Sequence, residues 1–467
     1  MKEHIYFYYT NDLHSNFDNW SQVSYYLKEA KKNCQSMGKS CWNVDIGDHI
    51  DRMHPIAEAF KGKANVQLMN EAGYDVVTLG NNEGITISHD DLAYLYDEAS
   101  FEVVCANLHS MNSKKPDWLN PSVILTSAYG VEIAVIGLTA PFNDYYQLLD
   151  WYVSPPYEQL EQMIGKIKQQ ADIIVLLSHL GYSEDQEIAK RFPDIDVIIG
   201  GHTHHLLRNG EIVNNTLLTA AGKHCHFVGE VILTWDHEQG RLVHKEAYTT
   251  NITHLPKDPQ TEEILTTYQQ KAERILAKPV VRLPETLEVD WRKETPILQA
   301  LTDSIKQQTN ADCSMLNAGL LLESLPSGVV TYGDIHRICP HPINTCVVEL
   351  TGRELLETIR SSFSKEFIEL KLKGFGFRGK IIGKMAFSGL SLCMERLKNG
   401  EAFVKQAYLE EKYPLKADQT YTIATADTFT FGRLLPEVAR SQVKNYYLPE
   451  FLRDILAETL IRAYSNK

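Results

Sequence analysis

The feature that most constrains this sequence is a repeated alternation in its first 250 residues. Short apolar runs rich in β-branched residues are each followed by a turn or polar segment, and then by a stretch with apolar residues at helical spacing. The apolar runs occupy residues 5–9, 42–46, 76–79, 103–105, 132–136, 173–177 and 197–199. Because uninterrupted apolar strands bounded by helices are typical of a sheet covered on both faces, the pattern predicts an α/β domain over residues 1–255.

A connecting helix and a second α/β domain are predicted for the rest of the chain. Residues 258–278 place apolar side chains at helical spacing, begin with Asp-Pro and stop before Pro279, which indicates a linker helix within residues 256–285. Residues 286–467 resume the alternation, with a helix near 297–308 and strands near 346–350 and 421–425. A length of 467 residues also favours two domains over one.

The charge balance narrows the class of partner. Lys and Arg total 46 against 60 Asp and Glu, a formal net charge of -14. A surface with this balance repels a polyanion, so bulk nucleic acid is not expected as a partner. A small anionic substrate is still compatible, because bound divalent cations dominate the electrostatic field of their own site.

The sequence carries no sign of export or membrane insertion. No basic segment followed by an apolar segment opens the chain, and no run of about 18 apolar residues occurs. The eight cysteines are scattered without a CxxC pair, which suits free thiols in a reducing compartment. We therefore expect a cytoplasmic protein that does not associate with a membrane, and its oligomeric state is not predicted.

Five of the apolar runs end at side chains that can bind metals. These side chains are Asp12 and His14 after the first run, Asp48 after the second, Asn81 after the third, His179 after the sixth, and His202 and His204 after the seventh. Ligands bind at the carboxyl ends of strands in open α/β sheets, so five such ends can converge on one crevice. Carboxylate, imidazole and amide donors suit a hard or borderline divalent cation such as Mn²⁺, Zn²⁺, Fe²⁺ or Mg²⁺. One such motif alone would more often be a cap or surface feature, but the five together indicate a metal centre.

The motifs around these side chains resemble those of a known family. They read Thr10-Asn11-Asp12-Leu13-His14, Gly47-Asp48, Gly80-Asn81, Ser178-His179 and Gly201-His202-Thr203-His204. In order and spacing they are similar to the 5'-nucleotidase branch of the calcineurin-like metallophosphoesterases, and the second half of the chain resembles that family's C-terminal nucleotide-binding domain more weakly. The resemblance implies an N-terminal αββα sandwich that holds the metals and a C-terminal α/β domain that binds the substrate.

The resemblance also implies a role for each metal-binding side chain. Carried over by position, Asp12, His14 and His204 bind one divalent cation, Asn81, His179 and His202 bind a second, and Asp48 bridges the two. A water or hydroxide between the ions is then the nucleophile. Two cations roughly 3.5–4 Å apart acidify a shared water and hold both the attacking and the leaving oxygen, which suits this role.

The sequence departs from the family at the residues expected to assist the leaving group. Where the family has Gly-Asn-His-Glu-Phe-Asp, this chain has Gly80-Asn81-Asn82-Glu83-Gly84-Ile85. Asn82 therefore replaces the catalytic histidine and Ile85 its aspartate partner. One possibility is that the metals alone suffice for catalysis and Asn82 donates a hydrogen bond to the phosphate. The other is that another histidine performs the role of the missing one; His49 and His54 are the first candidates and His109 is the next.

The predicted substrate-binding residues of the second domain are also divergent. Asn317 and Gly319 belong to an Asn-Ala-Gly-Leu-Leu run where the family has Asn-Gly-Gly-x-Arg, so Leu321 replaces an arginine that binds phosphate. His341 stands where the family has the phenylalanine of a Pro-Phe element, whose ring stacks on the base of the nucleotide. Phe429 or Phe431 would form the aromatic wall on the other face of the base. A nucleotide is the leading substrate by resemblance. His205, His224 and His226 are expected to lie outside the ligand set.

Three functional interpretations follow from these residues. The first is a metal-dependent phosphoester hydrolase that acts on a small molecule, as a 5'-nucleotidase or a 2',3'-cyclic nucleotide phosphodiesterase. The second is a phosphatase with a non-nucleotide substrate, which Leu321 and His341 favour. The third is a metal-bearing binding or regulatory protein with little turnover, which Asn82 and Ile85 favour.

Overall fold

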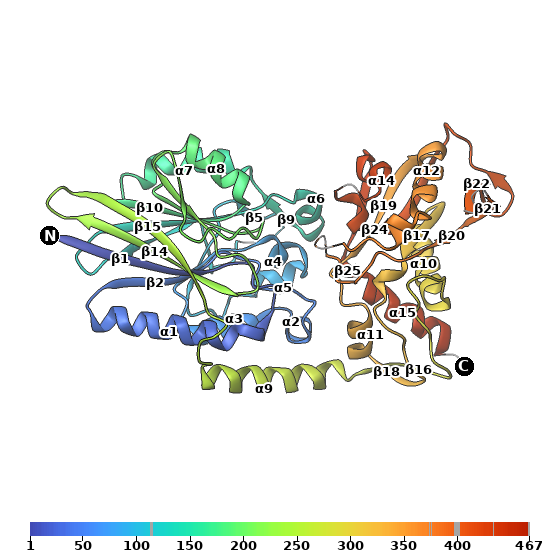
Figure 1. Ribbon diagram of the computed structural model, residues 1–467, viewed down its shortest axis with the longest axis horizontal. Coiled ribbons are helices and arrows are strands. Elements are labelled where there is room, and N and C mark those ends of the chain that lie inside the picture. Colours follow the sequence, from blue (N-terminus) through green and yellow to red (C-terminus); the bar gives the residue numbers. More distant parts are fainter. Residues whose placement is uncertain (113–114, 373, 375, 397–401, 433, 466–467) are drawn as a thin grey trace. The chain divides into compact units, whose positions relative to one another are not determined.

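The computed structural model describes residues 1–467 except 113–114, 373, 375, 397–401, 433 and 466–467 (Figure 1). Within the described residues the chain divides into two compact units, Met1–Ala272 and Glu273–Lys467. The division falls inside helix α9 (Pro259–Leu276). Among the helices that the structure describes, none combines length with enough apolar character to cross a membrane.

The first unit contains two β-sheets. The first sheet has the order β15-β14-β1-β2-β3-β4-β6, formed by β15 (Arg241–Asn251), β14 (Phe227–Asp236), β1 (Lys2–Thr10), β2 (Ser40–Asp45), β3 (Val76–Val77), β4 (Glu102–Val104) and β6 (Leu119–Asn120). The second has the order β12-β13-β11-β10-β8-β7, formed by β12 (Glu211–Val213), β13 (Thr216–Thr219), β11 (Val197–Gly200), β10 (Ile173–His179), β8 (Glu132–Thr139) and β7 (Ser122–Thr126). Strands β1, β2 and β3 are parallel neighbours, as are β8, β10 and β11, so the carboxyl ends of each set lie at one edge of their sheet.

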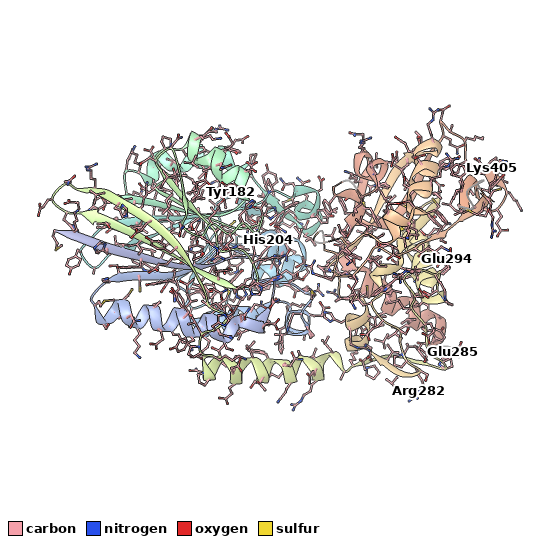
Figure 2. The ribbon with its side chains drawn as sticks, in the orientation of Figure 1. Tyr182, His204, Arg282, Glu285, Glu294 and Lys405 are labelled. Carbon is pink, nitrogen blue, oxygen red and sulfur yellow. The ribbon has the colours of Figure 1, made fainter. Side chains whose placement is uncertain are left out.

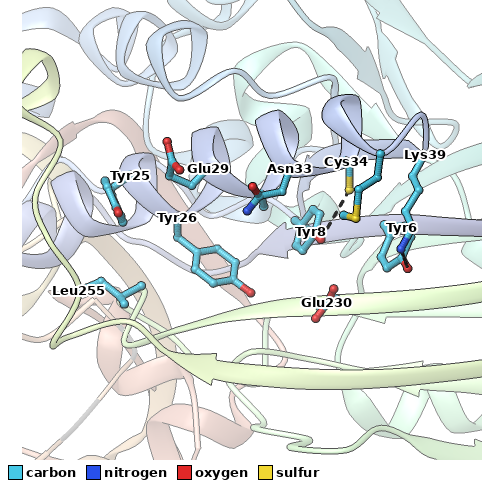
Figure 3. A pocket seen from close by; sticks show the side chains of 12 residues that line it. Tyr6, Tyr8, Tyr25, Tyr26, Glu29, Asn33, Cys34, Lys39, Glu230 and Leu255 are labelled. Atoms are coloured by element: carbon cyan, nitrogen blue, oxygen red, sulfur yellow. Dashed lines mark hydrogen bonds between the residues drawn. The ribbon is translucent and has the colours of Figure 1, made fainter.

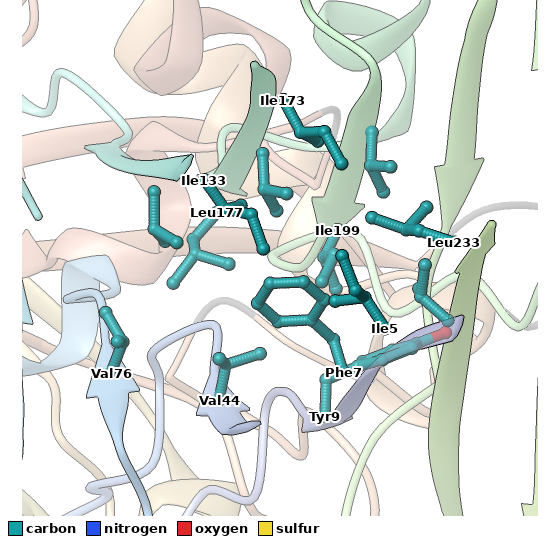
Figure 4. Close-up of a cluster of buried hydrophobic side chains, with 14 of the residues drawn as sticks. Ile5, Phe7, Tyr9, Val44, Val76, Ile133, Ile173, Leu177, Ile199 and Leu233 are labelled. Atoms are coloured by element: carbon teal, nitrogen blue, oxygen red, sulfur yellow. The ribbon is translucent and has the colours of Figure 1, made fainter. Parts of the chain in front are cut away.

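The side chains of β1 show why the two sheets pack together. Ile5, Phe7 and Tyr9 alternate along the strand with Tyr6 and Tyr8, so the two sets point to opposite faces of the sheet. The first set is fully buried in a core shared with apolar side chains of β8, β10 and β11 (Figure 4). This core is the middle layer of an αββα sandwich.

Helices cover the outer faces of the two sheets. Helices α7 (Pro156–Ile167) and α8 (Tyr182–Arg191) contribute to a second apolar cluster with β8, β10 and β11. Helices α1 (Trp20–Ser36) and α3 (Lys63–Ala72) lie on the other side of the sandwich (Figure 1). There Tyr6 and Tyr8 face α1 and line a cavity of about 380 Å³ with Tyr26 and Glu230 (Figure 3).

Shorter elements connect these layers. They are the helices α2 (Pro55–Phe60), α4 (Asn81–Ile85), α5 (His89–Ala93) and α6 (Asn143–Tyr146), the 3-10 turns Phe17–Asn19 and Gln147–Leu149, and the strand pair β5 (Leu108–Ser110) and β9 (Trp151–Val153). Only Thr78, Leu79 and Gly80 separate the end of β3 from the start of helix α4, so the connection at the carboxyl end of that strand is short.

The second unit is a mixed α/β domain around a five-stranded sheet. Its order is β20-β17-β24-β19-β25, formed by β20 (Met385–Ser388), β17 (Cys313–Asn317), β24 (Thr420–Ala426), β19 (Asn344–Thr351) and β25 (Lys444–Phe451). Two smaller sheets pair β16 (Pro279–Leu283) with β18 (Gly328–Thr331), and β22 (Ala402–Leu409) with β21 (Leu390–Arg396) and β23 (Tyr413–Pro414). The helices are α10 (Pro296–Thr309), α11 (Tyr332–Ile338), α12 (Gly352–Ser362), α13 (Lys365–Ile368), α14 (Pro436–Arg440) and α15 (Leu452–Tyr464), with 3-10 turns at Ala318–Leu320 and Asp427–Thr430.

Two helices of this unit begin at sequence-encoded caps. The Thr331 hydroxyl accepts from the backbone N–H of Asp334, and the Asp334 carboxylate accepts from the backbone N–H of Thr331. Thr351 and Glu354 form the same reciprocal pair at the start of α12. Each pair satisfies two donors that a helix start otherwise leaves unpaired, so these boundaries follow from local sequence.

Replacing Phe7 tests the shared core. Phe7→Ala removes a ring that is fully buried between the sheets, so we expect the free energy of unfolding to fall by about 3–5 kcal/mol. Tyr94→Ala is the matched control because the Tyr94 side chain is 60% exposed, and its effect should stay within about 0.5 kcal/mol. Urea unfolding of the full chain measures both variants, and equal losses would contradict the shared core.

Candidate metal centre

The predicted metal-binding residues all follow parallel strands of the two sheets. Asp12 and His14 follow β1, Asp48 follows β2, Asn81 opens α4 after a three-residue connection from β3, His179 ends β10, and His202 and His204 follow β11. The parallel arrangement places these strand ends together within each sheet, and the face-to-face packing brings the two sets to the same end of the sandwich. All seven residues belong to the first unit.

Asp12, His14 and His204 form the first group of candidate ligands. One donor atom of each lies within 4.8 Å of the others, a spacing that suits a shared cation. His14 Nε2 lies 3.1 Å from His204 Nε2, and Asp12 Oδ1 lies 3.5 Å from His204 Nε2. Asp12 is fully buried, whereas the side chain of His204, which Figure 2 labels, is 34% exposed.

Asp48, His179 and His202 form the second group, with donor atoms again within 4.8 Å of one another. Two buried atoms beside this group lack a hydrogen-bond partner among the described residues: Oδ1 of Asn81 and Nε2 of His179. Leaving such atoms unpaired in the interior costs roughly 1–3 kcal/mol each, which a bound cation would offset. The donor set therefore fits a divalent metal ion on grounds of both chemistry and burial.

The Asp48 carboxylate lies between the two groups. Its Oδ2 is 3.8 Å from His14 Nε2 in the first group, and its Oδ1 is 3.3 Å from His179 Nε2 in the second. The backbone N–H of Asn82 donates to Oδ1 at 2.8 Å and holds the carboxylate in this orientation. Asp48 is thus the side chain that faces donor atoms of both groups.

The backbone around the candidate ligands is strained. Positive φ values occur at Asp12 (52°), His14 (52°), Asp48 (50°), His202 (68°) and His204 (58°). Left-handed backbone costs a residue other than glycine of order 1–2 kcal/mol. Such strain persists only where the surrounding structure imposes it, and it concentrates at functional sites.

Hydrogen bonds behind the ligands fix their orientation. His179 Nδ1 lies 2.7 Å from the Ile46 carbonyl, so this nitrogen carries the proton and Nε2 faces the second group. Glu83 accepts from the backbone N–H groups of Gly80, Asp48 and Ile50 at 2.8–3.0 Å. A single carboxylate therefore ties the loop after β2 to the loop after β3.

The electrostatics of the centre favour positive charge. Burial alone would lower the pKa of His179, but the Asp48 carboxylate outweighs it and raises the pKa to about 10. Burial raises the pKa of Glu83 to about 7, and the negative charge of Asp48 adds to that shift. For His202, burial followed by the charge of His179 outweighs the charges of Asp48 and Asp12 and lowers the pKa to about 4. The buried carboxylates that retain a proton on His179 are equally suited to a metal cation.

The two histidines predicted as replacements for the missing catalytic histidine do not line the metal groups. His49 is 2% exposed, packs edge-to-face on Trp20 at 4.9 Å, and contacts Asn65 Nδ2 through Nδ1 at 3.1 Å. Burial lowers its pKa to about 3. His54 caps helix α2, where its Nδ1 accepts from the backbone N–H of Ile56. Both positions argue against a role in leaving-group chemistry.

Asn82 lies beside the first group but its side chain is engaged by the protein. Its amide nitrogen lies 3.0 Å from His14 Nδ1 and donates to the Ile50 carbonyl at 3.2 Å. The amide nitrogen of Asn81 donates to Oδ1 of Asn82 at 3.4 Å. These contacts place the Asn82 side chain against His14, and the Ile50 carbonyl takes one of its two N–H donors.

The predicted substrate-binding residues lie in the second unit, mostly in its interior. Asn317 donates to the Ile382 carbonyl at 2.7 Å, and a side chain at Gly319 would meet the Ile381 carbonyl at 2.0 Å. Phe429 is fully buried. Phe431 is half-buried and is the more accessible of the two phenylalanines.

His341 is also fully buried. Its Nδ1 accepts from the Arg378 backbone N–H at 2.9 Å, its Nε2 lies 3.0 Å from the Leu320 carbonyl, and Phe377 stacks on the ring at 5.3 Å. The predicted stacking of His341 and Phe429 on a base does not fit these positions, because buried rings have no face free for a ligand.

His224 lies beside the first group, although the sequence places it outside the ligand set. Its ring centroid is 6.0 Å from that of His14, and its backbone N–H donates to the Asp12 carbonyl at 2.9 Å. The signal in the sequence was weak: His224 shortly precedes β14, and only the antiparallel pairing of β14 with β1 brings it to the carboxyl end of β1.

A two-sheet sandwich with aspartate, histidine and asparagine donors at its strand ends is the arrangement of a metal-dependent phosphoesterase. Comparisons with known proteins support this class. Residues 5–206 match the family described as calcineurin-like phosphoesterase, and residues 277–433 match the family described as 5'-nucleotidase, C-terminal domain.

Individual relatives agree with these two family matches. The chain is 42% identical over 458 residues to the uncharacterized metallophosphoesterase YunD of Bacillus subtilis (strain 168), which covers 98% of this chain and 99% of that protein. It is 22% identical to a 5'-nucleotidase of Vibrio vulnificus (strain CMCP6), over 87% of this chain and 82% of that one. Among solved structures, a putative 5'-nucleotidase from Staphylococcus aureus in complex with alpha-ketoglutarate matches with a TM-score of 0.69 and 20% identity, over 98% of both chains.

The chain therefore belongs to the calcineurin-like metallophosphoesterases with a 5'-nucleotidase C-terminal domain. It is a metal-dependent phosphoester hydrolase of that family. The resemblance drawn from the sequence motifs and the two-domain α/β architecture are both confirmed.

A glycine substitution tests the tight packing at the centre. A Cβ at Gly47 would lie 2.1 Å from the backbone nitrogen of Gly80, so Gly47→Ala should separate the loops that carry Asp48 and Asn81. We expect less bound metal and a loss of stability of at least about 3 kcal/mol. Gly38→Ala is the control, because Gly38 also has a positive φ of 63° but no neighbour within 4 Å, so it should lose only about 1 kcal/mol. Equal effects of the two variants on metal content would refute the packing explanation.

The burial of His341 predicts a pH dependence of stability. Burial, followed by the charge of Arg378, lowers its pKa to about 3 in the folded state, whereas an unfolded histidine titrates near 6.5. Between these values the unfolded chain binds one more proton, so the stability due to neutral His341 is present above about pH 6.5 and is lost as the pH falls toward 3. His341→Gln should therefore reduce the slope of unfolding free energy against pH by up to about 1.4 kcal/mol per unit between pH 4 and 6. The exposed His254→Asn is the control, and an unchanged slope in His341→Gln would show that the imidazole titrates normally.

Proposed function

We propose that two divalent cations occupy the two groups and that this chain uses them to hydrolyse a nucleotide phosphoester. The observation that carries the proposal is the position of the Asp48 carboxylate, which faces donors of both groups. The unpaired buried atoms of Asn81 and His179 support a cation in the second group. Mn²⁺, Zn²⁺, Fe²⁺ and Mg²⁺ all suit the donors.

The residues of this chain would hold the candidate ligands in position before the substrate binds. Bound cations supply the Lewis acidity that activates a water and neutralises a phosphoryl group. Asp48 holds both positions at a fixed separation, and the bond from the Asn82 backbone fixes the carboxylate. His179 is held in the productive tautomer by Ile46. The loops are held in their strained conformation by folding itself, before the reaction begins. Little reorganisation of these side chains is therefore needed during the reaction.

A nucleotide is the proposed substrate class. Two facts support it: the family of the C-terminal domain and the name of the Vibrio vulnificus relative, which is a 5'-nucleotidase. A nucleoside 5'-monophosphate or a 2',3'-cyclic nucleotide would place its phosphate at the metal groups. A role in nucleotide breakdown in the cytoplasm stays a prediction from the sequence. The linker over residues 256–285 likewise stays a prediction.

A non-nucleotide phosphoester is the second candidate substrate. Leu321 stands in place of the family's arginine and is fully buried, and His341 and Phe429 are fully buried as well. Three of the positions expected to bind a nucleotide therefore offer neither a charge nor an aromatic face. Phe431, which is half-buried, is the remaining position that could contact a base.

Metal-dependent phosphate release distinguishes these possibilities. Metal-stripped full-length protein would receive Mn²⁺, Zn²⁺, Mg²⁺ or nothing, and would be offered nucleoside 5'-monophosphates, 2',3'-cyclic nucleotides, a sugar phosphate and bis(p-nitrophenyl) phosphate. We expect turnover of a nucleotide that requires metal, and a fall of at least about a hundredfold in Asp48→Asn. Asp97→Asn is the matched control, because Asp97 is exposed in the same unit and the change should have no effect.

The other outcomes are equally informative. Preference for the sugar phosphate would favour the second substrate class. Absence of turnover on every substrate in spite of bound metal would sink the hydrolase proposal and favour a binding protein. Full activity of Asp48→Asn would show that this carboxylate does not bind the cations.

A further inference from the structure

The histidine at position 224 is held against the metal centre by the loop between β13 and β14. The loop is anchored to the residue before Asp12: the Asn11 side chain donates to the Gly222 carbonyl at 2.6 Å and accepts from the Ala221 backbone N–H at 2.9 Å. The His224 backbone N–H in turn donates to the Asp12 carbonyl at 2.9 Å. The loop that carries His224 and the loop that carries the first metal group are therefore one connected structure.

The imidazole of His224 faces the first group. Its ring lies nearly perpendicular to that of His14, at 85° and a centroid distance of 6.0 Å. The backbone is left-handed at both His224 (φ 57°) and Cys225 (φ 46°). Cys225 is only 2% exposed and fixes the loop in the interior, while His224 keeps part of its surface open to solvent. A small ligand at the metal groups can therefore reach this ring.

His224 differs from the neighbouring histidines in its hydrogen bonds. His179 uses Nδ1 on the Ile46 carbonyl, His205 Nδ1 lies 2.8 Å from the Thr203 hydroxyl, and His226 Nδ1 lies 3.3 Å from the Asn19 amide. For the His224 ring, no hydrogen bond to a side chain or carbonyl occurs within the part of the chain that the structure describes. A neutral imidazole carries one donor and one acceptor, so both are available to a ligand.

Asn82 also lies beside the first group, where the resemblance to the family places a histidine. Its amide nitrogen donates to the Ile50 carbonyl at 3.2 Å and lies 3.0 Å from His14 Nδ1. Phosphoryl transfer places negative charge on the equatorial phosphoryl oxygens, and a donor aimed at that charge stabilises the transition state. Among the side chains near the first group, His224 combines an available donor with an open approach.

We propose that His224 is a catalytic residue whose imidazole N–H donates a hydrogen bond to a phosphoryl oxygen of the substrate at the metal centre. The proposal rests on the proposed phosphoester hydrolysis at these two groups. It involves a hydrogen bond only: the proton stays on the imidazole, and the bond that breaks is the phosphoester bond.

The test compares His224→Ala and His224→Gln with the wild-type full chain loaded with Mn²⁺. Gln keeps an N–H donor at similar reach, whereas Ala removes it. We expect kcat/KM to fall about 10- to 100-fold in His224→Ala and to recover to within about fivefold in His224→Gln. The loss should be the same for a p-nitrophenyl ester and for a nucleotide, because a phosphoryl contact does not depend on the leaving group. His226→Ala is the matched control, since His226 is an exposed neighbour whose ring is 6.3 Å from that of His224.

Two readouts besides turnover separate this role from a structural one. The affinity for inorganic phosphate, measured by calorimetry on the Mn²⁺-loaded protein, should weaken in His224→Ala and recover in His224→Gln. Metal content and melting temperature should match the wild type in both. Unchanged phosphate affinity, a loss of bound metal, or a loss confined to the nucleotide would each overturn the proposal. Inactive wild-type protein would instead count against the hydrolase function, and the phosphate titration would still decide whether His224 contacts the anion.

Discussion

The arrangement of this centre depends on a buried carboxylate placed between two sets of donors. Asp48 is 3% exposed and lies 3.3 Å from His179 and 3.8 Å from His14. A buried charge is costly unless it is paired, and here several carboxylates share one site. The buried carboxylates therefore require positive charge nearby. The donors that converge from both sheets can hold that charge as cations. Binding of cations would offset the cost that the fold incurs at Asp48.

The rigid parts of the sandwich make the strained loops possible. The parallel strands β1, β2 and β3 fix three ligand loops relative to one another, and Glu83 fastens the last two through backbone N–H groups. The shared core between the sheets then sets the position of His179, His202 and His204. Left-handed backbone at five candidate ligands is tolerable only because so much regular structure surrounds it. The same scaffold holds His224 at the edge of the site, since its loop is bonded to Asn11 and Asp12.

The sequence identifies the residues of the two candidate metal groups better than the side chains around them, for a physical reason. Each candidate ligand combines a local signal, the end of an apolar run, with a side chain of suitable chemistry, so Asp12 and Asp48 can be recognised without knowing the fold. His49 follows Asp48 directly, yet its ring packs in the core on Trp20, and nothing local distinguishes the two orientations. His224 is separated from Asp12 by more than 200 residues and meets it only through the pairing of β14 with β1. Burial of His341 likewise depends on Phe377 and Arg378, which belong to another segment.

For the fold too, local sequence signals predict the elements but not the contacts between distant segments. Apolar runs predict strands covered on both faces, but they cannot tell whether a helix or a second sheet provides the cover. In the first unit one face of each sheet meets the other sheet and the opposite face meets helices, and the family resemblance was needed to predict this sandwich. The long hairpin of β14 and β15 interrupts its apolar residues with polar ones, such as Glu230 in β14 and Lys245 and Glu246 in β15, so it carries no long apolar run.

The most direct test of the two-cation centre is the anomalous scattering from crystals grown with Mn²⁺. Two peaks about 3.5–4 Å apart are expected, one within bonding distance of Asp12, His14 and His204, the other of Asn81, His179 and His202, with Asp48 between them. A single peak, or two peaks that do not share Asp48, would contradict the proposed centre.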